Sequence, residues 1–289
     1  MGIKIDCKSI QENILEITRN NKLSHINYKL YILANNDIAS NIYIKNKVKI
    51  CEALGIECII TKDPQVIRDN CNINNDSCNK ITSGAIIQLP VDKEIEKMES
   101  YSLLQIEMKN GFILDVDATD VHSLHSLMNS NINIKPCTPS GIYWLLLNIM
   151  YDNNDCLKGK NVVIIGKSVI VGKSMALTLL NESCTVTVCD SNTKNLESFT
   201  RNADIIISAT GKKYLITEDM ITHNTVLIDV GITRDTDNKI YGDIHPNCYD
   251  KSSYYTTVPG GIGLLTTAMV AFNLVYGVNR IETYVNNVL

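Results

Sequence analysis

Tyr43 and Lys47 stand four positions apart in a stretch whose apolar residues have helical spacing. On an α-helix this spacing places both side chains on one face, one turn apart. The tyrosine offers a flat aromatic surface, and the lysine can donate or accept a proton. A surface lysine beside a tyrosine at the edge of the core would give the same pattern. The pair therefore indicates chemistry only if further polar groups join it.

Further polar groups end predicted strands in the same half of the chain. Gln88 lies near the end of an apolar run just before Pro90, and Asp115 and Asp117 end another short run. In parallel α/β sheets, ligands bind outside the carboxyl ends of the strands. We therefore expect these groups to face one rim, together with the lysine and the tyrosine.

A second candidate site lies in residues 159–175, with the sequence GKNVVIIGKSVIVGKSM. Residues 161–165 are typical of a buried parallel strand, Gly166 interrupts the run, and Gly172 opens a segment with helical spacing. Strand, glycine turn and helix form the phosphate-binding corner of a dinucleotide fold, where the backbone can approach a pyrophosphate. Because the spacing differs from G-x-G-x-x-G, a plain strand–helix turn stays an alternative.

The elements that must position these residues alternate along the chain, which predicts parallel strands with right-handed crossovers. In the first half we predict a helix at 41–54 and strands at 30–34, 57–61, 85–89 and 112–116. In the second half we predict an apolar helix at 141–150 and strands at 161–165, 185–189, 204–209 and 226–230. A glycine-rich turn, 258–263, leads into a last apolar helix at 264–276.

The predicted fold class is therefore α/β with two lobes. We expect a catalytic domain at residues 1–138, completed by 267–289, and a Rossmann-like dinucleotide-binding domain at 139–266. The C-terminal helix is expected to pack back on the first lobe. Two such lobes flank a cleft, where ligands usually bind.

Composition narrows the class of protein. The chain has 289 residues, of which 45% are hydrophobic and 20% charged, with a net charge of −4. This predicts a large core and gives no indication of nucleic acid as a partner. We find no apolar run of the roughly 18 residues that a membrane helix needs, and no signal peptide. The ten cysteines are dispersed without a C-x-x-C pair, so we expect reduced core thiols in a cytoplasmic protein and no metal site.

As a set, these residues resemble the methylenetetrahydrofolate dehydrogenase/cyclohydrolase family over nearly the whole chain. The matching segments are ASNIYIKNKVKICEALGI (39–56), GAIIQLP (84–90), DVD (115–117), PCTPSG (136–141), GKNVVIIGKSVIVGKSMALTLL (159–180), TVTVCDSNTKNL (185–196), DIIISATGK (204–212), IDVGITR (228–234) and VPGGIGLLTTAM (258–269). The resemblance implies a bifunctional enzyme of one-carbon metabolism. It would oxidise 5,10-methylenetetrahydrofolate with NADP and hydrolyse the methenyl product to 10-formyltetrahydrofolate.

By this resemblance the first lobe binds folate. Lys47 matches the catalytic lysine of the family's Y-x-x-x-K helix, and Tyr43 matches the aromatic residue that stacks on the folate rings. Gln88 matches the glutamine that hydrogen-bonds near Lys47 and helps to set its protonation state. Asp117 matches the carboxylate that holds the N–H groups of the pterin. Gly261, in the late glycine turn, would let the backbone approach the folate.

The resemblance also places the nicotinamide nucleotide in the second lobe, and implies a homodimer formed through these lobes. Gly166, Lys167 and Ser168 stand where the family has G-R-S. The other implied cofactor-binding residues are Asp190, Ser191, Ala209, Thr210, Gly211, Ile232 and Thr266. For Gly211, a plain turn before a helix is the alternative.

Asp190 bears on the choice between NADP and NAD. It lies 24 residues after Gly166, close to the spacing at which a dinucleotide fold places an acid on the adenosine ribose. An acid there hydrogen-bonds a 2′-hydroxyl and repels a 2′-phosphate, whereas Lys167 could pair with that phosphate. Because the family favours NADP, we predict NADP, with NAD as the alternative. Asp190 would then turn away from the phosphate, and Lys167 or Ser191 would contact it.

Several loop positions depart from the family pattern. Asn35 and Ile38 replace a glycine and a proline, Ala118 replaces the glycine after DVD, and Leu264 replaces a proline. None of these changes removes a candidate catalytic residue. They leave two alternatives open, namely an enzyme with the cyclohydrolase step alone and a folate- or nucleotide-binding homologue without catalysis.

Overall fold

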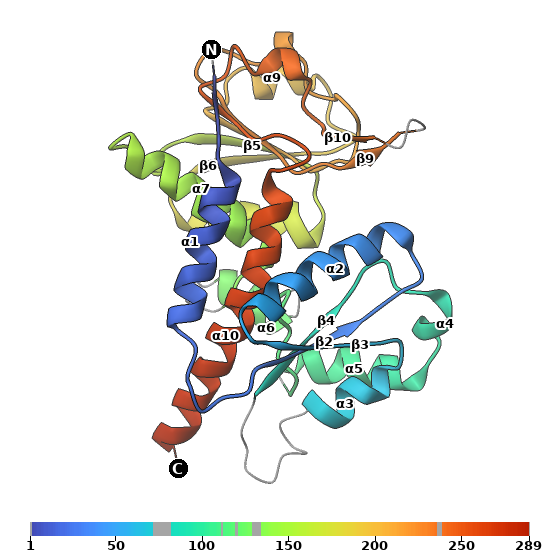
Figure 1. Ribbon diagram of the computed structural model, residues 1–289. Coiled ribbons are helices and arrows are strands. Elements are labelled where there is room, and N and C mark those ends of the chain that lie inside the picture. Colours follow the sequence, from blue (N-terminus) through green and yellow to red (C-terminus); the bar gives the residue numbers. More distant parts are fainter. Residues whose placement is uncertain are drawn as a thin grey trace. The chain divides into compact units, whose positions relative to one another are not determined.

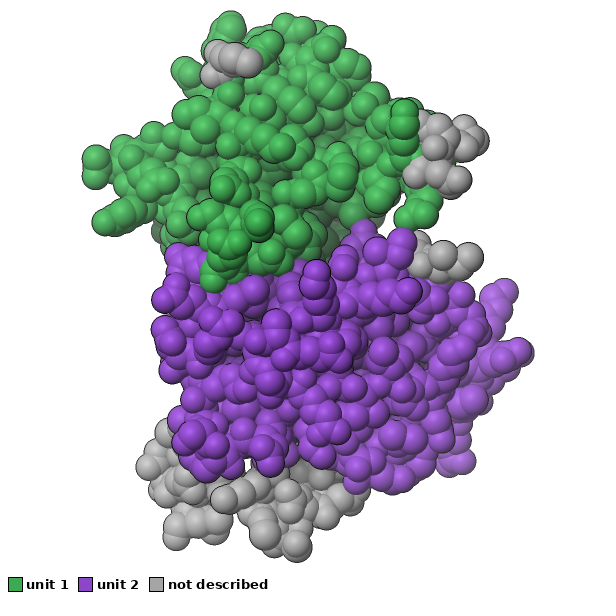
Figure 2. All heavy atoms as spheres, viewed as in Figure 1, with its two compact units in different colours: residues 1–12, 138–266 green, residues 13–137, 267–289 purple. Residues whose placement is uncertain are grey.

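The structure is a computed structural model that describes residues 2–71, 82–110, 112–118, 121–128, 134–235 and 239–288. These residues form two compact units (Figure 2). Unit 1 comprises Met1–Glu12 and Thr138–Thr266, and unit 2 comprises Asn13–Cys137 and Thr267–Leu289. Each unit contains a parallel sheet with helices, so the predicted α/β fold class is confirmed.

Unit 2 is built on a three-stranded parallel sheet. In spatial order its strands are β3 (Glu57–Thr61), β2 (Lys29–Leu33) and β4 (Ser83–Ile87). From central β2 the chain forms β3 on one side and then β4 on the other. The loops after β2 and β4 therefore diverge at a topological switch point, the usual place for a ligand in an open α/β sheet.

Helices cover both faces of this sheet (Figure 1). One face carries α2 (Ile38–Ala53), and the other carries α3 (Pro64–Cys71) and α5 (Glu99–Lys109). The strands and the last two helices enclose an apolar core that includes Leu33, Ile67 and Leu104. Two further helices of unit 2 are α4 (Lys93–Glu96) and α6 (Val121–Met128), whereas α1 (Cys7–Asn20) begins in unit 1 and ends in unit 2.

The boundaries of α2 and β4 differ from the predicted ones in a way that defines the site. The helix begins at Ile38, three residues early, because the Asp37 carboxylate accepts the N–H of Ser40 at 2.7 Å and caps it. The strand ends at Ile87, two residues early, so Gln88 is the first residue beyond it. Lys47 thus lies in the interior of a capped helix.

Residues 112–116 do not form the strand that the sequence predicts. Only Asp115 makes a β-bridge, to Ala85 of β4, and the chain then turns. The Asp115 carboxylate accepts the N–H of Asp117 at 3.1 Å, and Ala118 takes a left-handed conformation with φ of 53°. An aspartate can end a strand in this way because its side chain competes with the ladder for backbone N–H groups.

Unit 1 contains a six-stranded sheet in which every neighbouring pair is parallel. In spatial order the strands are β1 (Ile3–Lys4), β11 (Tyr254–Tyr255), β8 (Val226–Asp229), β7 (Ile205–Ser208), β5 (Asn161–Ile165) and β6 (Thr185–Cys189). The chain moves from β5 to β6 on one side and then to β7 on the other, so this sheet also has a switch point.

The remaining elements of unit 1 connect these strands. The helices are α7 (Cys137–Asp152), a π-helical turn η2 (Val169–Lys173), α8 (Ser174–Asn181) and α9 (Leu196–Thr200). Two 3₁₀ turns are η3 (Glu218–Met220) and η4 (Pro246–Cys248), and an antiparallel hairpin pairs β9 (Thr233–Arg234) with β10 (Ile240–Tyr241). The strands and turns enclose a second apolar core around Ile206 and Leu227.

The N-terminal residues do not belong to the first predicted domain. Ile3 and Lys4 of β1 pair with Tyr254 and Tyr255 of β11, so residues 1–12 group with unit 1. A Cβ atom at Gly2 would lie 2.2 Å from the Tyr249 carbonyl oxygen, so the chain end packs closely there. A strand of two residues has too short an apolar pattern to be predicted.

The last helix, α10 (Ile262–Val288), is longer than predicted. Its segment Ile262–Arg280 is long and apolar enough to cross a membrane, which corrects our expectation that no run reaches this length. However, 67% of that segment is buried, as in a core helix. Gly84 and Gly277 permit this packing, because a Cβ atom at Gly84 would lie 3.0 Å from the Leu274 side chain of α10, and one at Gly277 would lie 2.9 Å from the Leu114 side chain. In unit 2, α10 therefore packs on the first lobe, as predicted.

Candidate active site

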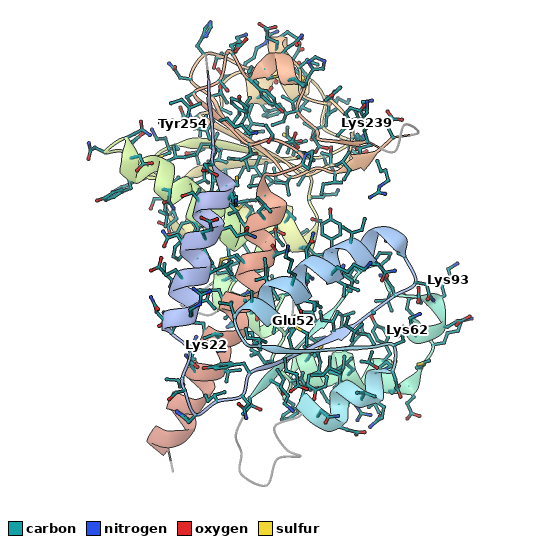
Figure 3. The ribbon with its side chains drawn as sticks, in the orientation of Figure 1. Lys22, Glu52, Lys62, Lys93, Lys239 and Tyr254 are labelled. Atoms are coloured by element: carbon teal, nitrogen blue, oxygen red, sulfur yellow. The ribbon has the colours of Figure 1, made fainter. Side chains whose placement is uncertain are left out.

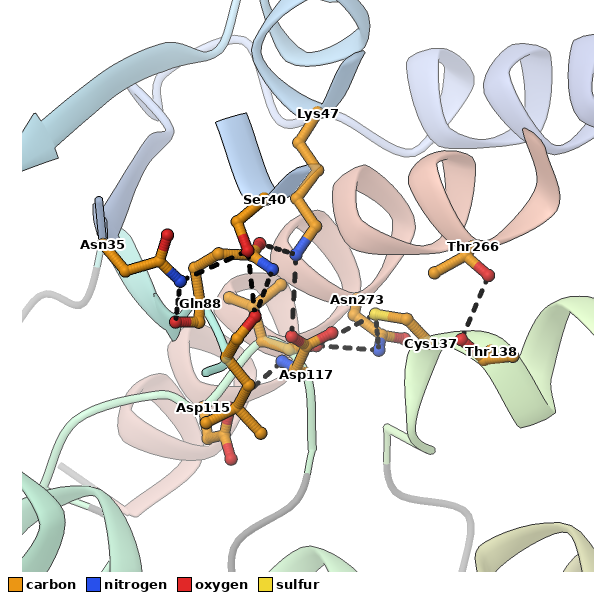
Figure 4. Close-up of polar contacts among 12 residues, drawn as sticks. Asn35, Ser40, Lys47, Gln88, Asp115, Asp117, Cys137, Thr138, Thr266 and Asn273 are labelled. Atoms are coloured by element: carbon orange, nitrogen blue, oxygen red, sulfur yellow. Dashed lines mark hydrogen bonds and ion pairs between the residues drawn. The ribbon is translucent and has the colours of Figure 1, made fainter. Parts of the chain in front are cut away.

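Lys47 is the centre of the first candidate site. Its side chain is 8% exposed, and Nζ lies 3.1 Å from Oε1 of Gln88 and 3.7 Å from Oδ2 of Asp117 (Figure 4). The structure thus brings together the three predicted catalytic residues from α2, the end of β4 and the bend after Asp115. An ammonium group has three N–H donors. The two contacts found among the described residues leave one for a ligand.

A hydrogen bond from its amide nitrogen orients the side chain of Gln88. Its Nε2 donates to the carbonyl oxygen of Leu89 at 3.2 Å, so Oε1 is the atom that faces Lys47. The backbone N–H of Gln88 donates to the Leu33 carbonyl at the end of β2, which fixes the residue at the edge of the sheet. The amide oxygen is therefore held as an acceptor for the ammonium group.

The bend that carries Asp117 is fixed by a residue the sequence did not single out. Asn273 of α10 is buried, and its Nδ2 donates to the carbonyl oxygens of Val116 at 2.9 Å and Lys135 at 2.8 Å. The buried Asp115 holds the other side of the bend. The available signal was an asparagine inside the apolar run 264–276, because a buried amide needs hydrogen-bond partners.

Cys137 completes the support of this bend. Its buried thiol donates to the Val116 carbonyl at 3.4 Å (Figure 4). Burial, reinforced by the negative charge of Asp117, raises the pKa of this thiol well above its usual value. Cys137 therefore stays a neutral hydrogen-bond donor, and its role is to hold backbone.

Asn35, which the sequence marks only as a departure from the family glycine, connects two parts of the site. It is 2% exposed, and its Nδ2 donates to the carbonyl oxygens of Gln88 at 3.3 Å and Pro90 at 2.5 Å. The same nitrogen lies 3.2 Å from Oγ of Ser40 in the first turn of α2. This asparagine thus joins the turn that carries Gln88 to the helix that carries Lys47.

The neighbouring Asn36 is also paired. Its N–H and Nδ2 donate to the Asp92 carboxylate at 3.1 and 2.7 Å, and its Oδ1 accepts from Lys62, which Figure 3 labels beside this loop. In this loop, Asn35 adds side-chain hydrogen bonds that the family glycine would not make, and Asn36 adds further ones to Asp92 and Lys62. They stiffen the turn between β2 and α2.

We expect Asn35→Gly to lower the hydrolytic kcat about two- to tenfold. A buried hydrogen bond contributes about 0.5–1.5 kcal/mol, and here it would be lost from the turn that orients Gln88. The control is Asn36→Gly, which adds the same flexibility to the loop without touching Gln88, and its kcat should stay within about twofold of wild type. Steady-state hydrolysis of the methenyl substrate measures both. Equal losses would show that loop flexibility, not the bond to Gln88, matters.

The two residues predicted to bind folate, Tyr43 and Gly261, lie on α2 and in the late glycine turn. Tyr43 is half-buried on α2, one turn before Lys47. Gly261 has a local reason to be glycine, because a Cβ atom there would lie 2.4 Å from the Thr257 carbonyl oxygen within the turn. Their contacts with folate stay predictions.

The second candidate site is the glycine turn after β5 in unit 1. Gly166 has φ of 113°, and a Cβ atom there would lie 2.4 Å from the Ala209 carbonyl oxygen, at the end of β7. A Cβ atom at Gly172 would lie 1.9 Å from the Gly166 carbonyl oxygen. Two glycines thus let three backbone segments meet at the switch point. The half-buried Gly166 and the exposed residues 167–170 that follow it leave backbone accessible to a pyrophosphate, so the residues present fit a dinucleotide.

The helix after this turn begins differently from the prediction. Gly172 does not open the helix but lies inside the π-helical turn η2, and α8 begins at Ser174. The reason is the close approach to Gly166, which requires a residue without a side chain in that turn. Ser168 caps the turn, since its Oγ accepts the N–H of Val171 at 3.2 Å.

Lys167 and Asp190 form an ion pair, with Nζ 2.5 Å from Oδ2. Their side chains are 61% and 21% exposed, so a ligand could exchange with either partner. Lys167, followed by the N–H of Asn192, lowers the pKa of Asp190. The sequence predicted opposite effects of these two charges on a 2′-phosphate, and the structure shows that they pair with each other. Ser191, the other predicted phosphate contact, is exposed next to the pair.

The other predicted cofactor residues line strand ends and turns of unit 1. Thr210 and Gly211 form the turn after β7, and the Gly211 carbonyl accepts from Oγ1 of Thr233 at 2.8 Å. Ile232, exposed after β8, lies beside this turn, with its carbonyl oxygen 3.7 Å from where a Cβ of Gly211 would be. Thr266, in the first turns of α10, shares a hydrogen bond of 3.1 Å with Thr138. Their contacts with a nucleotide stay predictions.

Comparison with known proteins identifies the family. The model of the tetrahydrofolate dehydrogenase/cyclohydrolase NAD(P)-binding domain matches residues 136–282. The bifunctional protein FolD of Clostridium novyi is 38% identical over 296 residues, which cover 96% of this chain and 99% of that protein. FolD of Mycoplasma capricolum is 39% identical over 251 residues, covering 84% of each.

Solved structures agree with these sequence matches. The crystal structure of the bifunctional enzyme FolD, a methylenetetrahydrofolate dehydrogenase/cyclohydrolase from Campylobacter jejuni, superposes with a TM-score of 0.83. It is 32% identical and covers 97% of this chain and 99% of its own. The chain belongs to the tetrahydrofolate dehydrogenase/cyclohydrolase family, and the resemblance found in the sequence is confirmed.

Proposed function

We propose that the protein oxidises 5,10-methylenetetrahydrofolate with NADP and then hydrolyses the 5,10-methenyl product to 10-formyltetrahydrofolate. The observation that carries this proposal is the buried Lys47, held between the Gln88 amide and the Asp117 carboxylate in a chain of this family. Bound NADP would accept the hydride from the methylene carbon, and Gly166, Lys167 and the turn after β7 would hold it.

The residues of unit 2 divide the work on folate. Tyr43 offers an aromatic face to the pterin, and Asp117 accepts hydrogen bonds from its N–H groups. Water adds to the methenyl carbon, and Lys47 moves a proton from this water to the ring nitrogen that leaves as the ring opens. The remaining hydroxyl proton goes to solvent as the formyl group forms. Gln88 keeps the lysine in place through Oε1.

The proposal is tested by giving the purified protein each substrate separately. With methylenetetrahydrofolate and NADP we expect reduced nicotinamide, and with methenyltetrahydrofolate alone we expect hydrolysis faster than in buffer. Hydrolysis without any nicotinamide reduction would instead support an enzyme with the cyclohydrolase step alone. Absence of both activities, with both ligands bound, would support a homologue without catalysis.

The ion pair of Lys167 and Asp190 should set the choice between NADP and NAD. We expect wild type to prefer NADP, with Lys167 exchanging the carboxylate for the 2′-phosphate. Asp190→Ser should raise the ratio of kcat/KM for NADP over NAD about fivefold or more, because it removes a repulsion of about 1 kcal/mol. Lys167→Ala should lower this ratio, because only the phosphorylated cofactor gains from the ammonium group.

The control for this prediction is Lys158→Ala, which removes an exposed lysine at the opposite end of β5. It should leave the ratio unchanged. The measurement is the pair of catalytic efficiencies for wild type and each variant at one ionic strength. A wild-type preference of about tenfold or more for NAD would contradict the proposal and assign Asp190 to the ribose hydroxyl.

We also propose that the protein is a cytoplasmic homodimer. The nine described cysteines are free, and burial raises the pKa of the thiols of Cys7 and Cys184 to about 11, as expected for reduced core residues. The family resemblance supports the dimer. Light scattering of the purified protein should give about twice the 32.2 kDa of one chain, and a monomer mass would contradict the dimer.

A further inference from the structure

A buried carboxylate in unit 1 accepts hydrogen bonds from the turn after β7. Asp243, after β10, is fully buried, and its Oδ2 accepts from Oγ of Ser208 at 2.8 Å and from N and Oγ1 of Thr210 at 2.7 and 2.9 Å. Its Oδ1 accepts the N–H of Lys212 at 2.9 Å. Four hydrogen bonds from a five-residue turn, 208–212, thus converge on one side chain.

This turn lies at the switch point of the sheet. Its Ala209 carbonyl oxygen is the atom that forces Gly166 to lack a side chain, so the position of the turn sets the space in the glycine loop. The carboxylate itself is tightly enclosed, because a Cβ atom at Gly231 would lie 1.9 Å from its Oδ1. A shift of Asp243 would therefore displace backbone beside the predicted pyrophosphate.

A second buried carboxylate orients Asp243. Asp229, at the end of β8, accepts the N–H groups of Asp243 at 2.9 Å and Ile244 at 3.0 Å. Burial raises the pKa of Asp229 to about 7. The N–H groups of Ile244 and Asp243 lower this pKa, whereas the negative charge of Asp243 raises it further. Asp229 can therefore carry a proton near neutrality, which avoids burying two negative charges together.

We propose that Asp243 is a positioning residue for the dinucleotide, whose carboxylate holds the turn 208–212 in the conformation that cofactor binding requires. The inference rests on the proposed dinucleotide binding and adds a residue that does not touch the cofactor. An ionised carboxylate suits this task because it accepts several hydrogen bonds and has no donor, whereas an amide would direct N–H groups at the donors of the turn.

The test is direct titration of NADP and NAD against wild type, Asp243→Asn and Asp229→Asn, by calorimetry. We expect Asp243→Asn to raise the better cofactor's Kd about tenfold or more, because hydrogen bonds to a charged group are lost from the turn. Its hydrolysis of methenyltetrahydrofolate without dinucleotide should stay near wild type. Asp229→Asn disturbs the N–H groups that orient Asp243 but removes none of the four acceptor contacts of the turn, so its Kd should rise by less than that of Asp243→Asn.

Thermal unfolding of each variant separates positioning from stability. If Asp243→Asn does not fold, Ser208→Ala removes one of the four bonds at a single hydroxyl and should raise the Kd about two- to fivefold. Equal Kd values for wild type and these variants would overturn the inference alone. The inference would also be overturned if Asp229→Asn and Asp243→Asn weakened dinucleotide binding equally, each in proportion to its loss of thermal stability. A wild-type protein that binds neither nucleotide would overturn the proposed function and, with it, this inference.

Discussion

Replacing Lys47 with methionine should abolish the hydrolysis of methenyltetrahydrofolate and leave hydride transfer largely intact. Methionine fills nearly the same volume but cannot carry a proton, and loss of an acid–base group costs about 10²–10⁴-fold in rate. Hydride transfer itself needs no protein base, so the dehydrogenase step should suffer less. The variant should therefore accumulate the methenyl intermediate when supplied with methylenetetrahydrofolate and cofactor. Rates of both steps on the purified variant measure the effect.

The matched control is Lys49→Met, which makes the same change at an exposed position two residues further along α2. Both rates should stay near wild type in that protein. If Lys47→Met retained more than about a tenth of the hydrolytic rate, this result would contradict the assignment of Lys47 as the proton carrier.

Replacing Asp117 with alanine should raise the KM for folate strongly and leave dinucleotide affinity nearly unchanged. Its side chain is 27% exposed beside Lys47, so one face of the carboxylate can reach a ligand. Hydrogen bonds to a charged group are worth about 1.5–3 kcal/mol, which corresponds to about 10- to 150-fold in affinity. Titration with a folate ligand and with the dinucleotide, each alone, measures the two affinities.

Glu57→Ala is the control for this second prediction, because it removes an acidic side chain of the same unit that pairs with Lys29 on the surface. Neither affinity should change in that variant. If Asp117→Ala weakened both ligands equally, Asp117 would support the fold and would not bind folate.

Local patterns predicted the elements whose residues repeat a simple signal. The spacing of Tyr43 and Lys47 correctly indicated a shared helix face, and the apolar run 161–165 matches β5 residue for residue. Such patterns predict structure correctly because they depend only on residues that are neighbours along the chain. The predicted strand ends indicated Gln88 and Asp117, the resemblance gave them roles, and the structure brings both to Lys47.

The supports of the site could not be predicted because they depend on contacts between distant parts of the sequence. Asn273 fixes the bend at Val116 from 157 residues away, and Asn35 bonds the Gln88 carbonyl from 53 residues away. Asp243 likewise reaches Ser208 across 35 residues. No periodicity records such pairs. The strand expected at 112–116 is reduced to one bridge at Asp115, where the backbone on either side of this residue pairs with Ala85. The N–H groups of Phe112 and Ile113 donate instead to the Glu107 carbonyl in α5.

The most direct test of the bifunctional assignment is to follow nicotinamide reduction and 10-formyltetrahydrofolate formation together, in one sample of purified protein given methylenetetrahydrofolate and NADP. We expect the two products to form in equal amounts, with little methenyl intermediate, because the site around Lys47 catalyses hydrolysis of the intermediate as it forms. Reduction of the cofactor with methenyltetrahydrofolate accumulating in the wild-type protein would contradict the hydrolytic role of Lys47. Formation of neither product would contradict the bifunctional assignment as a whole.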